Sequence, residues 1–106
     1  MFDSSWELDV YHYFKLNGLK VNRNIPIDFE SEGKLHRTFI DFEVEGYLFE
    51  VKGNHLLEGC FDNAPYMVPI ENKLNTYSVN NVNVITSFSD NIPNNSDVNF
   101  IDIALF

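Results

Sequence analysis

The sequence predicts a single α/β domain in which a helix, three strands, a second helix and a fourth strand follow one another. Three observations lead to this fold class. The 106 residues are 44% hydrophobic and 15% aromatic, which is enough for one globular core. Apolar residues recur at helical spacing near the N-terminus and at every second position after residue 24. Glu45 and Gly46 then divide an alternating stretch as a two-residue hairpin turn does.

The N-terminal half is expected to form one helix and a three-stranded meander. Residues 4–17 (SSWELDVYHYFKLN) carry apolar side chains at helical spacing. Ser4 with Glu7 matches a capping box, and Gly18 is suited to end the helix. Apolar and polar residues then alternate as they do in strands. The expected strands span residues 24–30, 35–44 and 47–53.

The C-terminal half is expected to add a second helix and a buried fourth strand. After a loop, the helix begins at Tyr66 or Pro69 and ends at Val79. Residues 82–88 (VNVITSF) predict the strand, and residues 91–97 a loop. We therefore expect one domain over residues 1–106, with a core over about 4–89. Residues 90–106 would supply a loop and an extra edge strand.

The net charge of −9 argues against a stand-alone DNA binder of high affinity. The seven Lys and Arg residues all lie between Lys15 and Lys73, so nucleic-acid contacts would need a local cluster, a bound metal or a partner. There is no leader-like segment and no apolar run of about 18 residues. Cys60 is the single cysteine. These features favour a cytoplasmic protein without a membrane span.

The stretch from Phe39 to Gly53 (FIDFEVEGYLFEVKG) predicts a hairpin with an acidic pair. Pairing outward from the turn places Val44 with Tyr47, Phe42 with Phe49 and Ile40 with Val51 on an apolar face. The opposite face would hold Glu43 with Leu48, Asp41 with Glu50 and Phe39 with Lys52. Paired carboxylates would have Cβ atoms about 5 Å apart. At an effective dielectric of about 20 they would repel by about 3 kcal/mol.

Three arrangements would offset this repulsion. The two carboxylates could splay apart on a solvated sheet face, where a surface ion pair contributes little to stability. Lys52 could neutralise one of them. A divalent cation could lie between them, and its chemistry would be hydrolysis.

The order of the elements and the motif residues resemble the PD-(D/E)XK nuclease superfamily, whose core runs αβββαβ. Asp41 on the second strand and Glu50-Val51-Lys52 on the third match its D…ExK signature, although Ile40 stands where the family name has proline. Glu7 lies in a first helix similar to that of small members, and FEVKGNH resembles short phage and homing-endonuclease-like nucleases. The resemblance spans about residues 4–89. It implies a restriction-endonuclease-like core, with a mixed sheet flanked by helices.

The resemblance also implies a role for each motif residue. Asp41, Glu50 and the backbone carbonyl of Val51 would bind Mg²⁺ or Mn²⁺. Lys52 would orient the attacking water or stabilise the developing oxyanion, and Glu7 would assist from the first helix, unless it only caps that helix with Ser4. Arg37, His55 and Lys73 are candidate substrate contacts; a solvated edge or loop position is the alternative for Arg37 and His55.

The expected function is a metal-dependent nuclease that hydrolyses phosphodiester bonds, in DNA rather than RNA, and that is encoded by a phage or mobile element. A homodimer or a separate partner would supply DNA recognition. One alternative is a catalytically silent, nuclease-like acidic protein that mimics nucleic acid or docks on a basic partner. Another is an α/β structural domain within a larger assembly.

Overall fold

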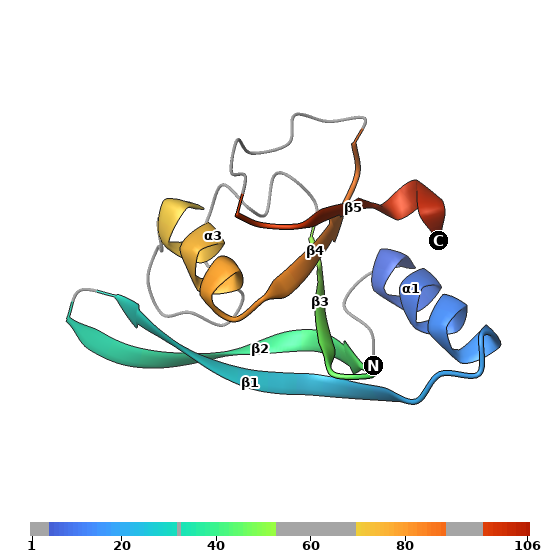
Figure 1. The fold of residues 1–106 in the computed structure, drawn as a ribbon, viewed down its shortest axis with the longest axis horizontal. Helices are drawn as coiled ribbons and strands as arrows, with labels where there is room; N and C mark the ends of the chain where they lie inside the picture. The colour runs from blue at the N-terminus through green and yellow to red at the C-terminus, as the bar shows by residue number, and fades with distance from the viewer. Residues whose placement is uncertain (1–4, 32, 53–69, 89–96) are drawn as a thin grey trace.

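The computed structural model describes residues 5–31, 33–52, 70–88 and 97–106, which form an α+β domain (Figure 1). Within them, the order of helix, three strands, helix and strand that the sequence predicts is confirmed. The elements are α1 (Ser5–Leu16), β1 (Val21–Ser31), β2 (Lys34–Val44), β3 (Tyr47–Val51), α3 (Ile70–Val79), β4 (Val82–Thr86), β5 (Phe100–Asp102) and the 3₁₀ helix η1 (Ile103–Leu105). No helix in these ranges has the length and apolar character to cross a membrane.

The five strands form one mixed sheet in the order β1-β2-β3-β4-β5. β1, β2 and β3 are antiparallel neighbours, whereas β4 runs parallel to β3 and β5 runs parallel to β4. A parallel pair needs a long crossover connection, and α3 lies in the crossover between β3 and β4. β5 has only three residues. The Asp102 side chain accepts a hydrogen bond from the Ala104 amide and starts η1 there.

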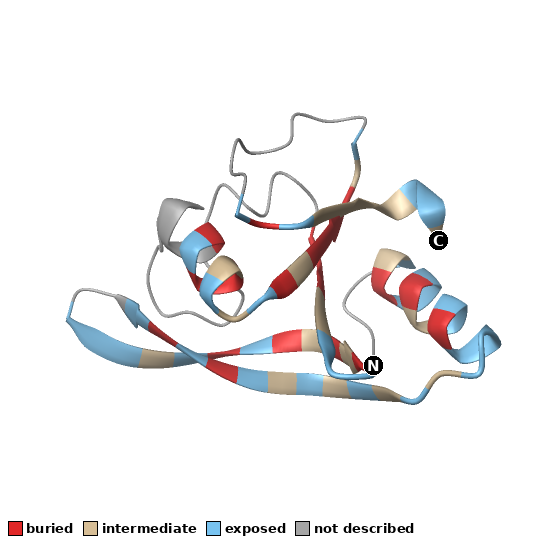
Figure 2. Cartoon of the chain, in the orientation of Figure 1, coloured by how far each residue is buried: buried red, intermediate tan, exposed pale blue. Residues whose placement is uncertain are grey.

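The two helices pack on opposite faces of the sheet (Figure 1). Val10 and Phe14 of α1 belong to one hydrophobic cluster, and Leu74 and Tyr77 of α3 belong to another. The buried apolar residues of the strands, red in Figure 2, belong to the same two clusters. The α1 cluster includes Phe42, Val44, Val51 and Ile85, and the α3 cluster includes Ile27, Phe29, Ile40, Val82, Val84 and Val98.

The turn between β2 and β3 confirms the predicted hairpin register. Glu45 and Gly46 both have positive φ angles, 52° and 86°, as a type I′ turn requires. The ladder that follows pairs Val44 with Tyr47, Glu43 with Leu48 and Phe42 with Phe49. These are three of the six pairs expected from the sequence.

The hairpin of β1 and β2 changes direction at Asn24 and Asp41. The ladder pairs Arg23 with Phe42 and Ile25 with Ile40, and Asn24 between them has a φ of 57°. Residues two apart on a regular strand share a face. Ile40 nevertheless packs in the α3 cluster and Phe42 in the α1 cluster. The prediction that Ile40 shares a face with Val51 is therefore wrong, because the strand turns over at Asp41.

Candidate active site

The candidate site lies where β2 and β3 separate. Their ladder ends at Phe42 and Phe49, so the expected direct pairing of Asp41 with Glu50 is not part of it. In a continuous ladder the Val51 amide would donate to the carbonyl of Ile40. It donates instead to Oδ2 of Asp41, at 2.8 Å. The carboxylate thus replaces a backbone acceptor at the point where the strands diverge, because a backbone amide in a folded chain needs a partner.

The backbone of β3 directs Val51 toward this gap. The N–H and C=O groups of one strand residue point to the same neighbouring strand. Since the Val51 amide contacts Asp41, the Val51 carbonyl is directed to the same side. The next amide, that of Lys52, donates to the carbonyl of Ile85 on β4 at 2.9 Å. β3 therefore offers one backbone oxygen to the side on which Asp41 lies.

Glu50 and Lys52 are buried, each with a relative exposure of 4%. Residues two apart on a strand share a face, which places Lys52 with Glu50. The Glu50 carboxylate accepts a hydrogen bond from the Tyr77 hydroxyl of α3 at 3.4 Å. The interpretation of these residues as a solvated sheet face is therefore wrong. Charged residues are buried this deeply almost only when they are paired.

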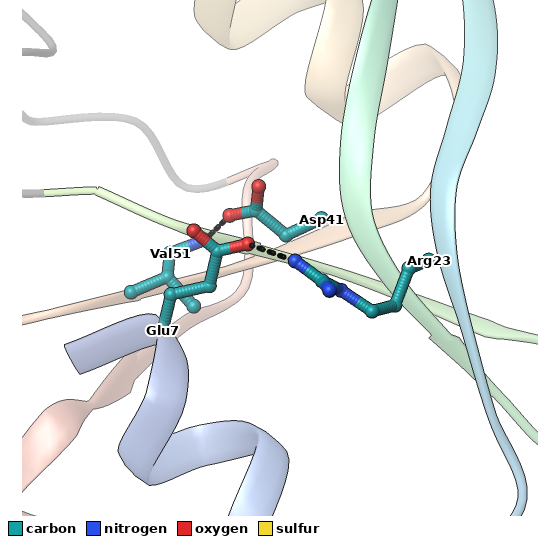
Figure 3. A network of polar contacts seen from close by, with 4 residues as sticks. All are labelled: Glu7, Arg23, Asp41 and Val51. Carbon is teal, nitrogen blue, oxygen red and sulfur yellow. Dashed lines mark hydrogen bonds and ion pairs between the residues drawn. The ribbon is translucent and has the colours of Figure 1, made fainter. Parts of the chain in front are cut away.

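Glu7 enters the site from α1 and is also buried, at 5% exposure. It shares the inward side of the helix with Val10 and Phe14, at the spacing of successive helical turns. Its carboxylate points toward Asp41 (Figure 3). Oε1 of Glu7 lies 3.6 Å from Nη2 of Arg23. Ser4, the proposed capping partner, lies outside the described residues.

Arg23 is a site residue that the sequence did not reveal. We expected the first strand to begin at residue 24, but β1 begins at Val21 and carries Arg23 opposite Phe42. No local pattern marks it, because Asn22 and Arg23 are both polar and do not continue the alternation of the strand. The guanidinium carbon lies 6.0 Å from the centroid of the Tyr11 ring, within the range of cation–π contacts.

Of the other candidate substrate contacts, Arg37 has a described side chain, and it pairs with Asp28 and not with this cluster. Arg37 lies on the hairpin arm, which is the part of β1 and β2 between Ile25 and Ile40. It lies opposite Asp28 and donates from Nε to Oδ1 of that residue at 3.0 Å. The hydrogen bond and then the negative charge of Asp28 raise the pKa of Arg37 above its ordinary value. Lys73 lies on α3, with a side chain outside the described part of the chain. His55 lies outside the described residues altogether.

The donor set suits a hard divalent cation. The carboxylates of Asp41 and Glu50 and the carbonyl of Val51 are oxygen ligands of the kind that Mg²⁺ and Mn²⁺ prefer. Within the described ranges, no three His, Cys, Asp or Glu side chains converge as a metal site, so a backbone oxygen would have to complete the set. Comparisons of the chain with protein-family models, curated proteins and solved structures found no match.

Proposed function

We propose that this chain is a metal-dependent nuclease of the PD-(D/E)XK type, which hydrolyses phosphodiester bonds in DNA. The observation that carries the proposal is the burial of three motif charges next to the strand junction at Asp41: Glu7 from α1, and Glu50 and Lys52 on β3, where Glu50 contacts Tyr77 of α3. Burying charged groups costs folding free energy even when they are paired. Three of the four motif residues (Glu7, Asp41, Glu50 and Lys52) are buried in this chain. Their burial lowers the stability of the fold, and a function would explain why the chain keeps them there.

The fold supports the same proposal. A restriction-endonuclease-like core needs the element order αβββαβ and a mixed sheet between helices. The order of α1, β1, β2, β3, α3 and β4 and the parallel pairing of β3 with β4 agree with that requirement. The motif acids lie at the junction of the antiparallel and parallel halves of the sheet.

Each residue has a proposed part in the reaction. Asp41, Glu50 and the Val51 carbonyl would hold Mg²⁺ or Mn²⁺, which would neutralise charge on the scissile phosphate and acidify a water molecule. Asp41 also fixes the β3 backbone through the Val51 amide. Lys52 would donate to the attacking water or to the developing oxyanion. Glu7 would position the cationic Arg23 beside the site.

The formal charges of the proposed site residues nearly cancel, unlike those of the whole chain. Glu7, Asp41 and Glu50 carry three formal negative charges, and Arg23 and Lys52 carry two positive charges, which leaves −1. A divalent cation would change this to +1. A phosphodiester would then meet a locally favourable charge, although the chain as a whole carries −9.

A second candidate function is that of an acidic interaction protein with a nuclease-like fold. The observation in its favour is the hairpin arm, on which the apolar side chains of Leu35 and Phe39 are exposed beside Arg37. Exposed apolar side chains on a protruding element suit contact with a partner protein. This function would leave the buried acids without a catalytic role.

A cleavage assay separates the two functions. Plasmid DNA, single-stranded DNA and RNA would be incubated with the wild type in Mg²⁺ or Mn²⁺, beside Lys52→Ala and Lys52→Met. We expect cleavage of DNA by the wild type and a loss of about 100-fold or more in both variants, because the oxyanion would lose its cation. Cleavage that persists undiminished in both variants would come from a contaminant and would contradict the proposal.

A further inference from the structure

We propose that Arg23 is the phosphate-binding residue of this site, and that Glu7 holds its guanidinium ready until a substrate phosphate binds. This inference rests on the proposed nuclease function. It adds a residue that the D…ExK motif does not contain. It also gives Glu7 the task of positioning a cation.

The placement of Arg23 follows from the β1–β2 register. Arg23 pairs with Phe42, the neighbour of Asp41, immediately before the distortion at Asn24. Phe42 packs in the α1 cluster, so Arg23 lies on the α1 side of the sheet, where Glu7 enters. The guanidinium points toward the Glu7 carboxylate (Figure 3).

The ion pair between Arg23 and Glu7 is long. The nitrogen and oxygen are 3.6 Å apart, whereas Arg37 and Asp28 are 3.0 Å apart on the arm. Charge-assisted hydrogen bonds are usually about 2.7–2.9 Å. Glu7 therefore attracts Arg23 through charge without a short hydrogen bond along this contact. Arg23 can therefore exchange its contact with Glu7 for a stronger contact with a bound anion.

Arg23 is also the more accessible of the two cations at the site. Its side chain is 27% exposed, whereas that of Glu7 is 6% exposed and Lys52 is buried. A phosphate arriving from solvent can thus meet Arg23 while Glu7 stays in place. The planar guanidinium can donate two parallel hydrogen bonds to phosphate oxygens, which an ammonium group cannot do. Arg23 would bind the phosphate, and Lys52 would act at the reacting atoms.

The test measures binding of a short fluorescein-labelled single-stranded DNA by anisotropy, over a series of NaCl concentrations and in a Lys52→Ala background that blocks cleavage. Arg23→Gln is expected to weaken binding about 10-fold. It should also reduce the slope of log affinity against log salt by about 0.7, the effect of one lost phosphate contact. Arg23→Lys should keep the slope. Lys15→Gln removes an exposed charge from α1 and should change neither quantity.

The double variant Glu7→Gln/Arg23→Gln distinguishes phosphate binding from simple neutralisation of Glu7. If Arg23 only neutralised a buried carboxylate, Glu7→Gln would restore wild-type affinity and slope to Arg23→Gln. We expect the double variant to regain the wild-type thermal midpoint but not the affinity. In the cleaving protein, Arg23→Lys should raise KM more than it lowers kcat.

Two outcomes would overturn this inference for different reasons. An unchanged salt slope in Arg23→Gln, with wild-type cleavage intact, would remove Arg23 from the phosphate site and leave the nuclease proposal standing. A wild type that neither binds nor cleaves DNA would overturn the nuclease proposal and, with it, the role of Arg23.

Discussion

At the residue scale, Asp41 has two tasks that can be separated. One carboxylate oxygen accepts the Val51 amide where β2 and β3 part, and this contact supports the fold. The proposed catalytic task depends on negative charge near a cation. An amide side chain can take over the first task because it retains an oxygen acceptor, but it lacks the charge for the second.

We therefore predict different effects of Asp41→Asn and Asp41→Ala. Asp41→Ala leaves the Val51 amide without its acceptor and should lower the free energy of unfolding by about 1–3 kcal/mol. Asp41→Asn should lower it by less than about 1 kcal/mol, while both variants lose cleavage. Urea unfolding and the plasmid assay measure the two effects. An Asp41→Asn protein that still cleaves DNA would remove Asp41 from the cation site.

Tyr77 offers a second prediction at this scale. Its hydroxyl donates to Glu50, and its ring is fully buried against the sheet. Tyr77→Phe keeps the packing but removes the donor, so we expect stability to fall by about 1 kcal/mol. Cleavage should fall by about 10-fold, as is usual when a supporting partner of a metal ligand is lost. Glu50→Gln, assayed beside it, should lose far more activity; equal losses would contradict a supporting role for Tyr77.

The motif residues differ in how well the sequence revealed them. Asp41, Glu50 and Lys52 could be selected because their spacing fits a hairpin and a known signature. Arg23 could not, because a single arginine before an expected strand has no pattern to mark it. Its placement beside Glu7 depends on the packing of α1 against β1, a tertiary contact that local periodicity does not report.

At the scale of elements, the β2–β3 turn was the most predictable feature. Two residues between alternating stretches suffice to fix the register of a hairpin. The bend at Asn24 was not predictable. Ile40 and Phe42 read as one continuous alternation, and only the packing of two different helices shows that they belong to opposite faces.

The turn supports a prediction about stability. Glu45 has a φ of 52°, a conformation that asparagine adopts more readily than glutamate. Glu45→Asn should therefore raise the free energy of unfolding by about 0.5–1 kcal/mol. Gly46→Val should lower it by at least about 1–2 kcal/mol because valine strains at positive φ. Thermal unfolding measures both. A stabilising Gly46→Val would contradict the type I′ turn and the register that depends on it.

At the scale of the whole molecule, the order of the elements and the α/β class follow from the sequence pattern and agree with the structure. The strand order and the parallel pairing of β4 with β3 did not follow from local patterns, because they depend on how the α3 crossover packs. The net charge of −9 is a property of the whole chain, and the ion pair of Glu7 with Arg23 is local. The net charge of the chain and the charges at the candidate site therefore have to be considered separately.

The small number of basic residues at the site leads to a prediction about how DNA binding depends on salt concentration. If Arg23 and Lys52 are the main phosphate contacts, single-stranded DNA should bind the wild type with a salt slope of about 1–2, since each contact contributes about 0.7. A titration in EDTA at several NaCl concentrations measures this slope. A slope of about 5 would show that nucleic acid binds a larger basic surface elsewhere on the protein.

The central claim is that the acids at the strand junction bind a divalent cation, and the most direct test is the thermal midpoint in Mn²⁺. A ligand that binds the folded state at 100 times its Kd stabilises it by about 2.7 kcal/mol, which raises the midpoint of a small domain by several degrees. We predict this rise for the wild type and for Glu43→Gln, a neighbouring carboxylate that contacts Asn22 outside the site. Asp41→Asn should show little or no rise. An equal rise in the wild type and Asp41→Asn, or none in either, would contradict the cation site.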